Sequence, residues 1–543
     1  MRKHLFAIVL AILYGTLLVA PLIGHQAYLT GDGAFYLARI QDVLDGHASL
    51  GNAYLWEHKE GLPQQLFLAE NILAHPLRLF HISVETGYII YTGLLGALVF
   101  FLSYVTFRSV SKSQAVALLG TSVMFVGLFM SRMLRPVSPQ FNILFFILEL
   151  FLLWKAQASG RYQWFILSGL NLGFLFYIYP YYWTAYLILI GLLIVYGFFR
   201  DRPFLLRLLL VLGIAFLVAL PYGYLTLQSS RLPVYAETLT RVGLIYSRFP
   251  SGITTFLWSF VPLLCYLAAI KKKIIPISSE TWFWICALIT HPIAANQHII
   301  TGKNLEFSSH YNMGAIYFSL VALAYLISRS NWALTIRGAV YALASAMIII
   351  GFVGYVRQMK VPAFNEYSSV ISWLEKNTAP DSVVLAPEDL SQIIPAYTRN
   401  NVFFARNANL FFISDQEVID RFLINNYFES ITAEFVVDNV RSLYGVRYQD
   451  IYGHTNQENK LRNLLGLTVR PAVFLPHEAI AFVQERAKFI QSLSFQDALA
   501  SYRVDYLIWD AEQQPDWPLD TFDFLKLLDA EGRYRIFKVS FGQ

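Results

Sequence analysis

The chain has 543 residues, of which 56% are apolar and only 14% are charged. Residues 1–355 hold 23 Lys and Arg against 12 Asp and Glu, whereas residues 356–543 hold 18 against 24. Because soluble proteins carry about 25% charged residues, the first part has too few charges to cover a surface that faces water. The composition excludes a wholly soluble enzyme, a disordered chain and a nucleic-acid-binding domain built on a basic surface.

Apolar runs recur throughout residues 1–355. A helix needs about 20 mainly apolar residues to cross the hydrocarbon core of a bilayer. The runs predict about eleven transmembrane helices, near residues 5–23, 86–107, 115–131, 141–155, 164–179, 180–199, 204–224, 252–270, 281–295, 313–328 and 338–355. We therefore expect a polytopic α-helical membrane domain. We interpret the first run as an anchor, because it exceeds the usual core of a signal peptide, about 7 to 15 residues.

Lys and Arg residues predict the orientation, because short cytoplasmic connections are rich in them. Alternate connections hold 14 of the 23 Lys and Arg residues of this part, with only Asp201 and Glu280 as acids. This pattern predicts an integral protein of the inner or plasma membrane with a cytoplasmic N-terminus. Eleven crossings then place residues 356–543 outside the cytoplasm.

The first outer connection, residues 24–85, is long and holds seven of the twelve acids of residues 1–355. Near its start, Gly31-Asp32-Gly33 precedes apolar residues at helical spacing, which predicts a surface helix that Asp32 caps and Gly46 ends. At 100° per residue, Asp32, Tyr36 and Arg39 share one face of that helix. We predict that Asp32 is a catalytic base and that Tyr36 and Arg39 bind substrate. The alternative role of Asp32 is helix capping alone.

Further candidate substrate-binding residues lie in three outer connections. Glu57 belongs to the acidic first connection, where Glu57 or Glu60 is the alternative base to Asp32 and a solvated surface is the alternative explanation of these charges. Arg132 and Arg135 lie in a very short connection, and arginine can hold phosphate in a bidentate way; anchoring to lipid headgroups is their alternative role. Lys303 and His310 lie in residues 296–312, among other groups that can bind phosphate or sugar hydroxyls.

The sequence indicates no certain cofactor. The histidines of residues 296–312 do not have a recognised zinc spacing, so a divalent metal stays an alternative that no motif supports.

Residues 356–543 have the composition of a soluble domain. Short β-type runs occur at Val383–Ala386, Val402–Phe404, Phe435–Val437, Tyr506–Trp509 and Tyr534–Val539, between amphipathic stretches at Tyr367–Lys376 and Glu417–Phe428. This alternation predicts a C-terminal soluble α/β domain. The predicted domains are residues 1–355, the membrane domain with its long outer connection, and residues 356–543, the extracytoplasmic domain.

The order of these parts resembles the GT-C superfamily of integral membrane glycosyltransferases. The resemblance covers the whole chain in architecture, and in residues it rests mainly on Gly31-Asp32 with Tyr36 and Arg39. The Trp-Trp-Asp signature of oligosaccharyltransferase catalytic subunits is absent, so the resemblance is to the superfamily and not to one member.

The resemblance implies an inverting transferase for cell-envelope glycans. Its donor would be a sugar linked to polyprenyl phosphate, and its acceptor a glycan, a lipid or a protein at the outer face of the membrane. Asp32 would match the acid of the first loop that acts as base. A transporter or flippase of lipid-linked glycans and a non-catalytic membrane assembly protein are the alternatives. Internal repeats and charges along a path through the bundle would favour a transporter.

Overall fold

The computed structural model describes residues 4–22, 31–63, 67–304, 310–329, 334–358, 367–530 and 532–541. The chain forms two compact units, each assembled from separate stretches of sequence. Unit 1 comprises Met1–His25, Thr86–Tyr224 and Ser247–Pro362. Unit 2 comprises Gln26–Glu85, Leu225–Tyr246 and Ala363–Gln543. The first outer connection, which the sequence analysis assigned to the membrane domain, thus belongs mostly to unit 2, and the boundary at residue 355 stays a prediction.

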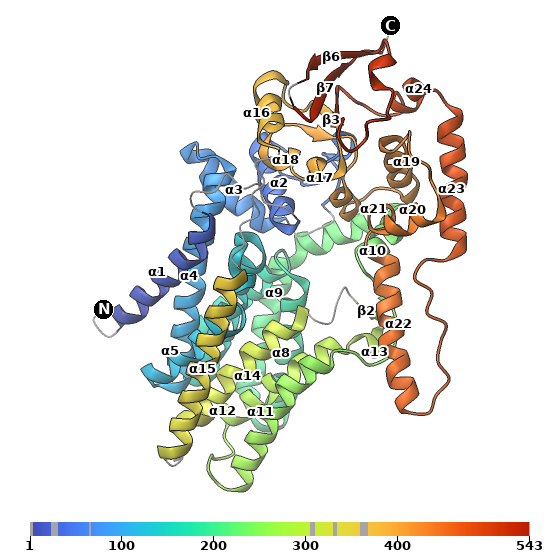
Figure 1. The fold of residues 1–543 in the computed structure, drawn as a ribbon. Helices are drawn as coiled ribbons and strands as arrows, with labels where there is room; N and C mark the ends of the chain where they lie inside the picture. The colour runs from blue at the N-terminus through green and yellow to red at the C-terminus, as the bar shows by residue number, and fades with distance from the viewer. Residues whose placement is uncertain are drawn as a thin grey trace. The chain divides into compact units, whose positions relative to one another are not determined.

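Long apolar helices make up most of unit 1 (Figure 1). Its elements are α1 (Leu5–Val19), η2 (Ala20–Leu22), α4 (Val84–Ser111), α5 (Gln114–Ser122), η4 (Val123–Leu128), η5 (Met130–Leu134), η6 (Pro136–Phe141), α6 (Asn142–Ser159), α7 (Tyr162–Leu175), α8 (Pro180–Arg200), α9 (Arg202–Ser229), α11 (Ile253–Lys271), α12 (Ser279–Ala295), α13 (His298–Thr301), β2 (Lys303–Asn304), α14 (Tyr311–Arg329) and α15 (Leu334–Gln358). Helix α8 begins at Pro180, because proline fits the first turn of a helix and cannot continue the preceding one.

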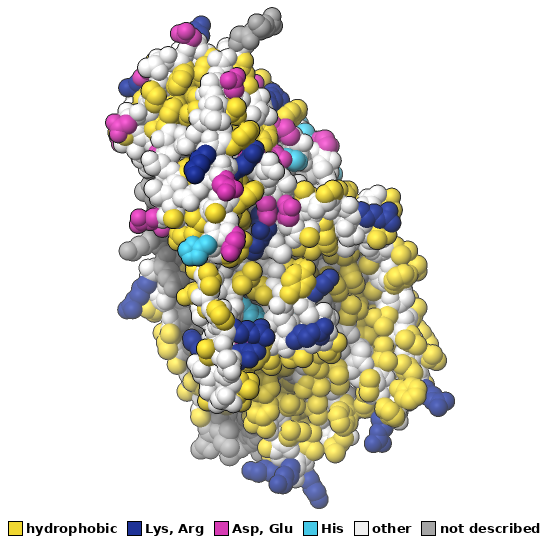
Figure 2. Space-filling model, turned by 90° about the vertical axis from the view of Figure 1, so that its right-hand side faces the viewer, with side chains coloured by type: hydrophobic (Ala, Val, Ile, Leu, Met, Phe, Trp, Pro, Cys, Tyr) yellow, Lys and Arg dark blue, Asp and Glu magenta, His cyan; other side chains and the backbone are white. Residues whose placement is uncertain are grey.

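Eight helices among the described residues are long and apolar enough to cross a membrane. Each of the eleven predicted runs falls on a helix, but α7 has only 14 residues, α12 has 17, and α5 with η4 reaches only from Gln114 to Leu128. The predicted count of eleven crossings is therefore not confirmed. Large apolar side chains such as Phe216 and Ile350 are exposed, and Figure 2 shows a broad hydrophobic surface with Lys and Arg along its lower edge. These features identify an integral membrane protein.

Unit 2 combines shorter helices with a small sheet. Its elements are α2 (Asp32–Asp45), η3 (Trp56–His58), α3 (Leu68–Phe80), α10 (Tyr235–Arg241), β1 (Ile245–Tyr246), α16 (Ser368–Asn377), β3 (Val383–Leu385), α17 (Glu388–Ser391), α18 (Ile394–Tyr397), β4 (Asn401–Val402), η8 (Arg406–Leu410), α19 (Asp415–Asn425), α20 (Ala433–Asp438), α21 (Val440–Tyr444), α22 (Arg447–Leu464), α23 (His477–Ser492), α24 (Phe495–Leu499), β5 (Tyr506–Asp510), η9 (Leu519–Thr521), β6 (Leu525–Asp529) and β7 (Tyr534–Val539).

The sheet has the strand order β4-β3-β5-β7-β6. Strand β3 is parallel to β4 and to β5, whereas β7 is antiparallel to β5 and to β6. Four of the five predicted β-type runs are strands here, which confirms the expected mixture of helices and strands. The run Phe435–Val437 was predicted wrongly, because it lies in α20. Thr432 caps that helix by accepting a hydrogen bond from the Phe435 N–H at 3.1 Å, and this cap outweighs the β-propensity of the run.

Candidate active site

Helix α2 carries the predicted base. It begins at Asp32, and the N-cap is Gly31, whose φ of 56° suits glycine. The prediction that Asp32 itself caps the helix is therefore wrong. Asp32 lies exposed in the first turn, where the helix dipole stabilises a carboxylate. Gly46 ends the helix in a left-handed conformation, as its sequence predicts.

The two other candidates on α2 differ from Asp32 in burial. Tyr36, one turn after Asp32, is half-buried, and its ring lies edge-on to Phe35 at 5.3 Å between centroids. Arg39 is 1% exposed, and its Nε–H donates to Glu70 Oε1 of α3 at 2.7 Å. Asp32 and Tyr36 thus form the accessible part of the predicted face, and Arg39 joins α2 to α3. Substrate binding by Tyr36 and Arg39 stays a prediction.

Glu57 lies in an ionic cluster within unit 2. Its Oε2 is 2.9 Å from Nη2 of Arg421, and its Oε1 accepts a hydrogen bond from the backbone N–H of Arg503 at 3.2 Å. Arg421 also pairs with Glu417 at 2.9 Å, and the His58 ring contacts the same Glu417 carboxylate. Burial alone would raise the pKa of Glu417, but His58 and Arg421 together lower it below its usual value. These contacts hold the first outer connection against the C-terminal residues.

Unit 1 brings together three of the predicted binding residues, Arg132, Arg135 and His310. The Tyr181 ring stacks on His310, with centroids 4.5 Å apart and an interplanar angle of 18°, and the Tyr179 hydroxyl is hydrogen-bonded to His310 Nδ1. Burial, followed by the positive charges of Arg132 and Arg135, lowers the pKa of His310 to about 4. We call these five residues the arginine–histidine cluster.

The two arginines of the cluster have different surroundings. Arg132 is exposed in η5, with its guanidinium 5.7 Å from the centre of the Phe129 ring. Arg135 is half-buried between η5 and η6, and burial lowers its pKa. Both charges act at the site of one histidine, so the cluster can accept an anion. Lys303 lies exposed on β2, in a connection whose residues 305–309 are outside the described part of the chain.

Glu149 is an acid inside the Pro136–Ser159 span. It is fully buried on α6, and its carboxylate accepts hydrogen bonds from Ser168 and, at 2.9 Å, from the amide of Asn171 on α7. Both of its oxygens are therefore bonded, which is the structural role expected of an acid that joins two helices. Within the described residues, no group of three or more His, Cys, Asp or Glu could hold a metal ion.

One polar cavity of the structure was not predicted from the sequence. It lies in unit 2 beside the ends of β3 and β5, and its lining includes Glu388, Asp389 and Asp510. A signal was present, because acids follow or end two β-type runs, and the carboxyl ends of neighbouring parallel strands meet at one edge of a sheet.

No protein-family model matches the sequence, and no curated protein does. Solved structures share the fold. The oligosaccharyltransferase AglB from Archaeoglobus fulgidus, in complex with an inhibitory peptide and a dolichol-phosphate, matches 94% of this chain and 70% of its own at 12% identity and a TM-score of 0.50. The Archaeoglobus fulgidus oligosaccharyltransferase tethered to an acceptor peptide matches 95% of this chain and 70% of its own, at 12% identity and a TM-score of 0.51.

ArnT from Cupriavidus metallidurans bound to undecaprenyl phosphate matches 100% of this chain and 99% of its own, at 11% identity and a TM-score of 0.46. The likeness to the oligosaccharyltransferase structures shows that this chain has the GT-C fold, which the resemblance in its sequence predicted.

Proposed function

We propose that this chain, which has the GT-C fold, is a membrane glycosyltransferase that moves a sugar from a polyprenyl-phosphate carrier to an acceptor at the outer face of the membrane. The observation that carries the proposal is the fold, shared over 94% of the chain with an oligosaccharyltransferase whose structure holds a dolichol-phosphate. A related structure holds an acceptor peptide. The acceptor in this proposal is a glycan, a lipid or a protein.

Cations at one end of unit 1 support the proposed orientation. Burial, then the charge of Lys155 and those of Arg329 and Arg108, lowers the pKa of Lys112 against the opposing charge of Glu280, so these three cations lie near Lys112. Arg135 precedes the Pro136–Ser159 span and Lys155 lies near its end, and the α-helical part from Asn142 to Lys155 alone spans about 20 Å at 1.5 Å per residue. The positive-inside rule assigns the Lys112 end to the cytoplasm and the Arg135 end to the outer face.

The arginine–histidine cluster is the phosphate site in this proposal. During transfer, the bond between the anomeric carbon and the phosphate oxygen breaks, and its electron pair stays on the leaving phosphate. Arg132 and Arg135 stabilise this charge, because charge-assisted hydrogen bonds to phosphate are strong at a boundary of low dielectric constant. His310 is neutral near pH 7, since its pKa is about 4, and it holds the Tyr179 hydroxyl.

Asp32 is the base in this proposal. It takes the proton of the acceptor hydroxyl while the hydroxyl oxygen forms its bond to the anomeric carbon. A direct displacement of this kind inverts the anomeric carbon, as the resemblance to GT-C enzymes implies. The Asp32 carboxylate also positions the acceptor hydroxyl for its attack on the anomeric carbon.

Asp32→Asn tests the proposal in cells that lack the endogenous protein. We expect the variant to reach wild-type abundance and melting temperature, and to lose the surface glycan that wild-type protein restores, as measured by mass spectrometry of lipid-linked and surface glycans. Glu60→Gln is the comparison variant, because Glu60 is a 79% exposed acid of the same connection and the alternative base, and we expect it to keep the glycan. An unchanged glycan profile with Asp32→Asn would overturn the assignment of the base.

A further inference from the structure

We call the polar cavity of unit 2 the sheet-edge cavity. It lies between β3 and β5, where the order in which the chain adds strands to the sheet reverses. From β3 the chain moves to β4 on one side, and it later returns to β5 on the other side. Both neighbours are parallel to β3, so the carboxyl ends of β3 and β5 leave a crevice between the departing connections. Ligands of open α/β sheets bind at such switch points. The cavity has a volume of about 350 Å³, within the range of about 300–1,000 Å³ typical of small-molecule sites.

One wall of the cavity is fixed by a buried carboxylate. Asp510, at the end of β5, is 1% exposed and accepts hydrogen bonds from Arg533 Nε at 2.8 Å and from the backbone N–H groups of Glu512 and Gln513. Tyr367 completes this wall, and its ring centroid lies 6.0 Å from that of Tyr534. These groups are held in place before any ligand arrives, which lowers the entropy that binding would cost.

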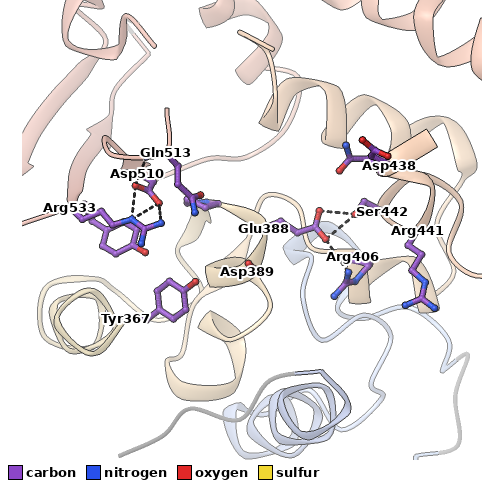
Figure 3. Close-up of a pocket in the computed structure, with 13 residues that line it drawn as sticks. Tyr367, Glu388, Asp389, Arg406, Asp438, Arg441, Ser442, Asp510, Gln513 and Arg533 are labelled. Carbon is purple, nitrogen blue, oxygen red and sulfur yellow. Dashed lines mark hydrogen bonds and ion pairs between the residues drawn. The ribbon is translucent and has the colours of Figure 1, made fainter. Parts of the chain in front are cut away.

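The opposite wall carries a second carboxylate. Both oxygens of Glu388 accept from the Ser442 hydroxyl, at 2.9 and 2.7 Å, and Arg406 lies 3.8 Å from Glu388 Oε1 (Figure 3). Arg406 is 43% exposed, so it lies at the rim and keeps donors for a ligand. The two walls therefore offer fixed acceptors and fixed donors to one ligand.

The charges and polarity of the lining select the class of ligand. Four carboxylates and three arginines line the cavity, so a phosphorylated ligand would meet more acids than cations. An apolar ligand would leave those groups unsolvated without replacing their hydrogen bonds. A compact neutral molecule with many hydroxyls suits both the carboxylates and the arginines, because each hydroxyl can donate to a carboxylate and accept from an arginine or an amide. The volume would hold about a dozen waters of about 30 Å³ each, which is room for one sugar ring.

We infer that the sheet-edge cavity binds one neutral sugar ring of a glycan. The binding itself does not depend on transferase activity. The role of that glycan as acceptor or product rests on the proposed function.

The test uses the full-length protein in lipid nanodiscs and saturation-transfer NMR. The probes are the methyl glycosides of glucose, mannose and galactose, with the 6-phosphate of each as its anionic counterpart. We expect at least one neutral glycoside to bind saturably and its 6-phosphate to bind at least about tenfold more weakly. Glu388→Gln should weaken binding about five- to tenfold, because it replaces one charged acceptor. If Glu388→Gln does not fold, Arg406→Gln replaces it as the test, because Arg406 lies at the exposed rim, and it should weaken binding by a similar factor.

Glu478→Gln is the matched control, because Glu478 lies exposed on α23 and does not line the cavity. The inference fails if none of the neutral glycosides binds, if a 6-phosphate binds more tightly, or if Glu388→Gln and Arg406→Gln bind as the wild type does. Asp32→Asn separates the two proposals. If Asp32→Asn binds the glycosides as the wild type does, sugar binding by the cavity is supported whether or not transfer is lost. If the wild type transfers sugar but binds no glycoside, only the inference about the cavity is overturned.

Discussion

The Nε–H of Arg39 donates to Oε1 of Glu70 at 2.7 Å, and the two side chains are only 1% and 2% exposed. The guanidinium also lies 5.3 Å from the centre of the Phe35 ring and 5.8 Å from that of Phe411. Arg39 therefore joins the helix that carries Asp32 both to α3 and to C-terminal residues of unit 2. This geometry favours a positioning role for Arg39.

Removal of either partner should destabilise the protein strongly. Arg39→Ala or Glu70→Gln leaves a buried charge or a buried donor without its partner, and we expect a loss of about 3–5 kcal/mol in the free energy of unfolding. The double variant Arg39→Met, Glu70→Leu should be closer to wild type, because it removes both charges together. Denaturant unfolding of the purified protein measures the difference. Wild-type stability of Arg39→Ala, with a raised KM for donor, would instead favour direct substrate binding.

Glu57→Gln should lower the free energy of unfolding by less than Arg39→Ala or Glu70→Gln does. The Glu57 carboxylate is 30% exposed, and its partner Arg421 keeps a second carboxylate in Glu417, so we expect a loss of about 1 kcal/mol and retained transfer. Melting temperature and the glycan profile of cells that express the variant report the two quantities separately. Loss of transfer at wild-type stability would show that Glu57 binds substrate.

His310 predicts a specific dependence of stability on pH. Its pKa is about 4 in the folded protein against an ordinary value of 6.5, so the unfolded state binds more protons between these values. Stability should therefore fall as the pH drops from about 6.5 to about 4, by up to ~3 kcal/mol at 1.36 kcal/mol per pKa unit. Melting temperatures measured across this range should decline less in His310→Gln than in wild type. Parallel curves would contradict the prediction.

Gly15 lets α1 approach α4 closely. A Cβ at this position would lie 2.3 Å from the backbone oxygen of Gly93 and 3.2 Å from Cβ of Ala97. Small residues allow such contact between membrane helices. Gly15→Leu should lower stability by about 1–3 kcal/mol through overpacking, measured as a lower melting temperature in detergent. Gly213→Leu on α9 is the control, because no atom of the described residues, apart from the adjoining chain of its own helix, lies within 4 Å of a Cβ there, and it should melt near wild type.

The membrane helices could be predicted because length and hydropathy alone define them. Every predicted run is helical, yet α7 and α12 are shorter than a full crossing, and α5 is interrupted after Ser122 by π-helical and 3₁₀ turns. Hydropathy does not detect such interruptions. Most strands were also found, because β-branched runs followed by turns are local signals.

The candidate site was less accessible to sequence. Helical spacing placed Asp32, Tyr36 and Arg39 on one face, but burial depends on what packs over each turn, and Glu70 and Phe411 cover Arg39. Likewise, nothing local to His310 indicates that Arg132 and Arg135 lie near it, because these residues are far apart in sequence. The sheet-edge cavity depends on strand order, which a single sequence does not specify.

The discontinuous composition of unit 2 has a consequence for its biosynthesis. Helix α2 packs against α18, and the Tyr54 carbonyl accepts from the Val402 N–H at 2.9 Å, although nearly 350 residues separate the two. A ribosome adding about 5–20 residues per second needs roughly 20–70 s to make the later partner. During that interval the early loop exposes the apolar side chains that it will later bury. A chain that terminates before residue 394 keeps them exposed, and becomes a substrate for proteolytic quality control.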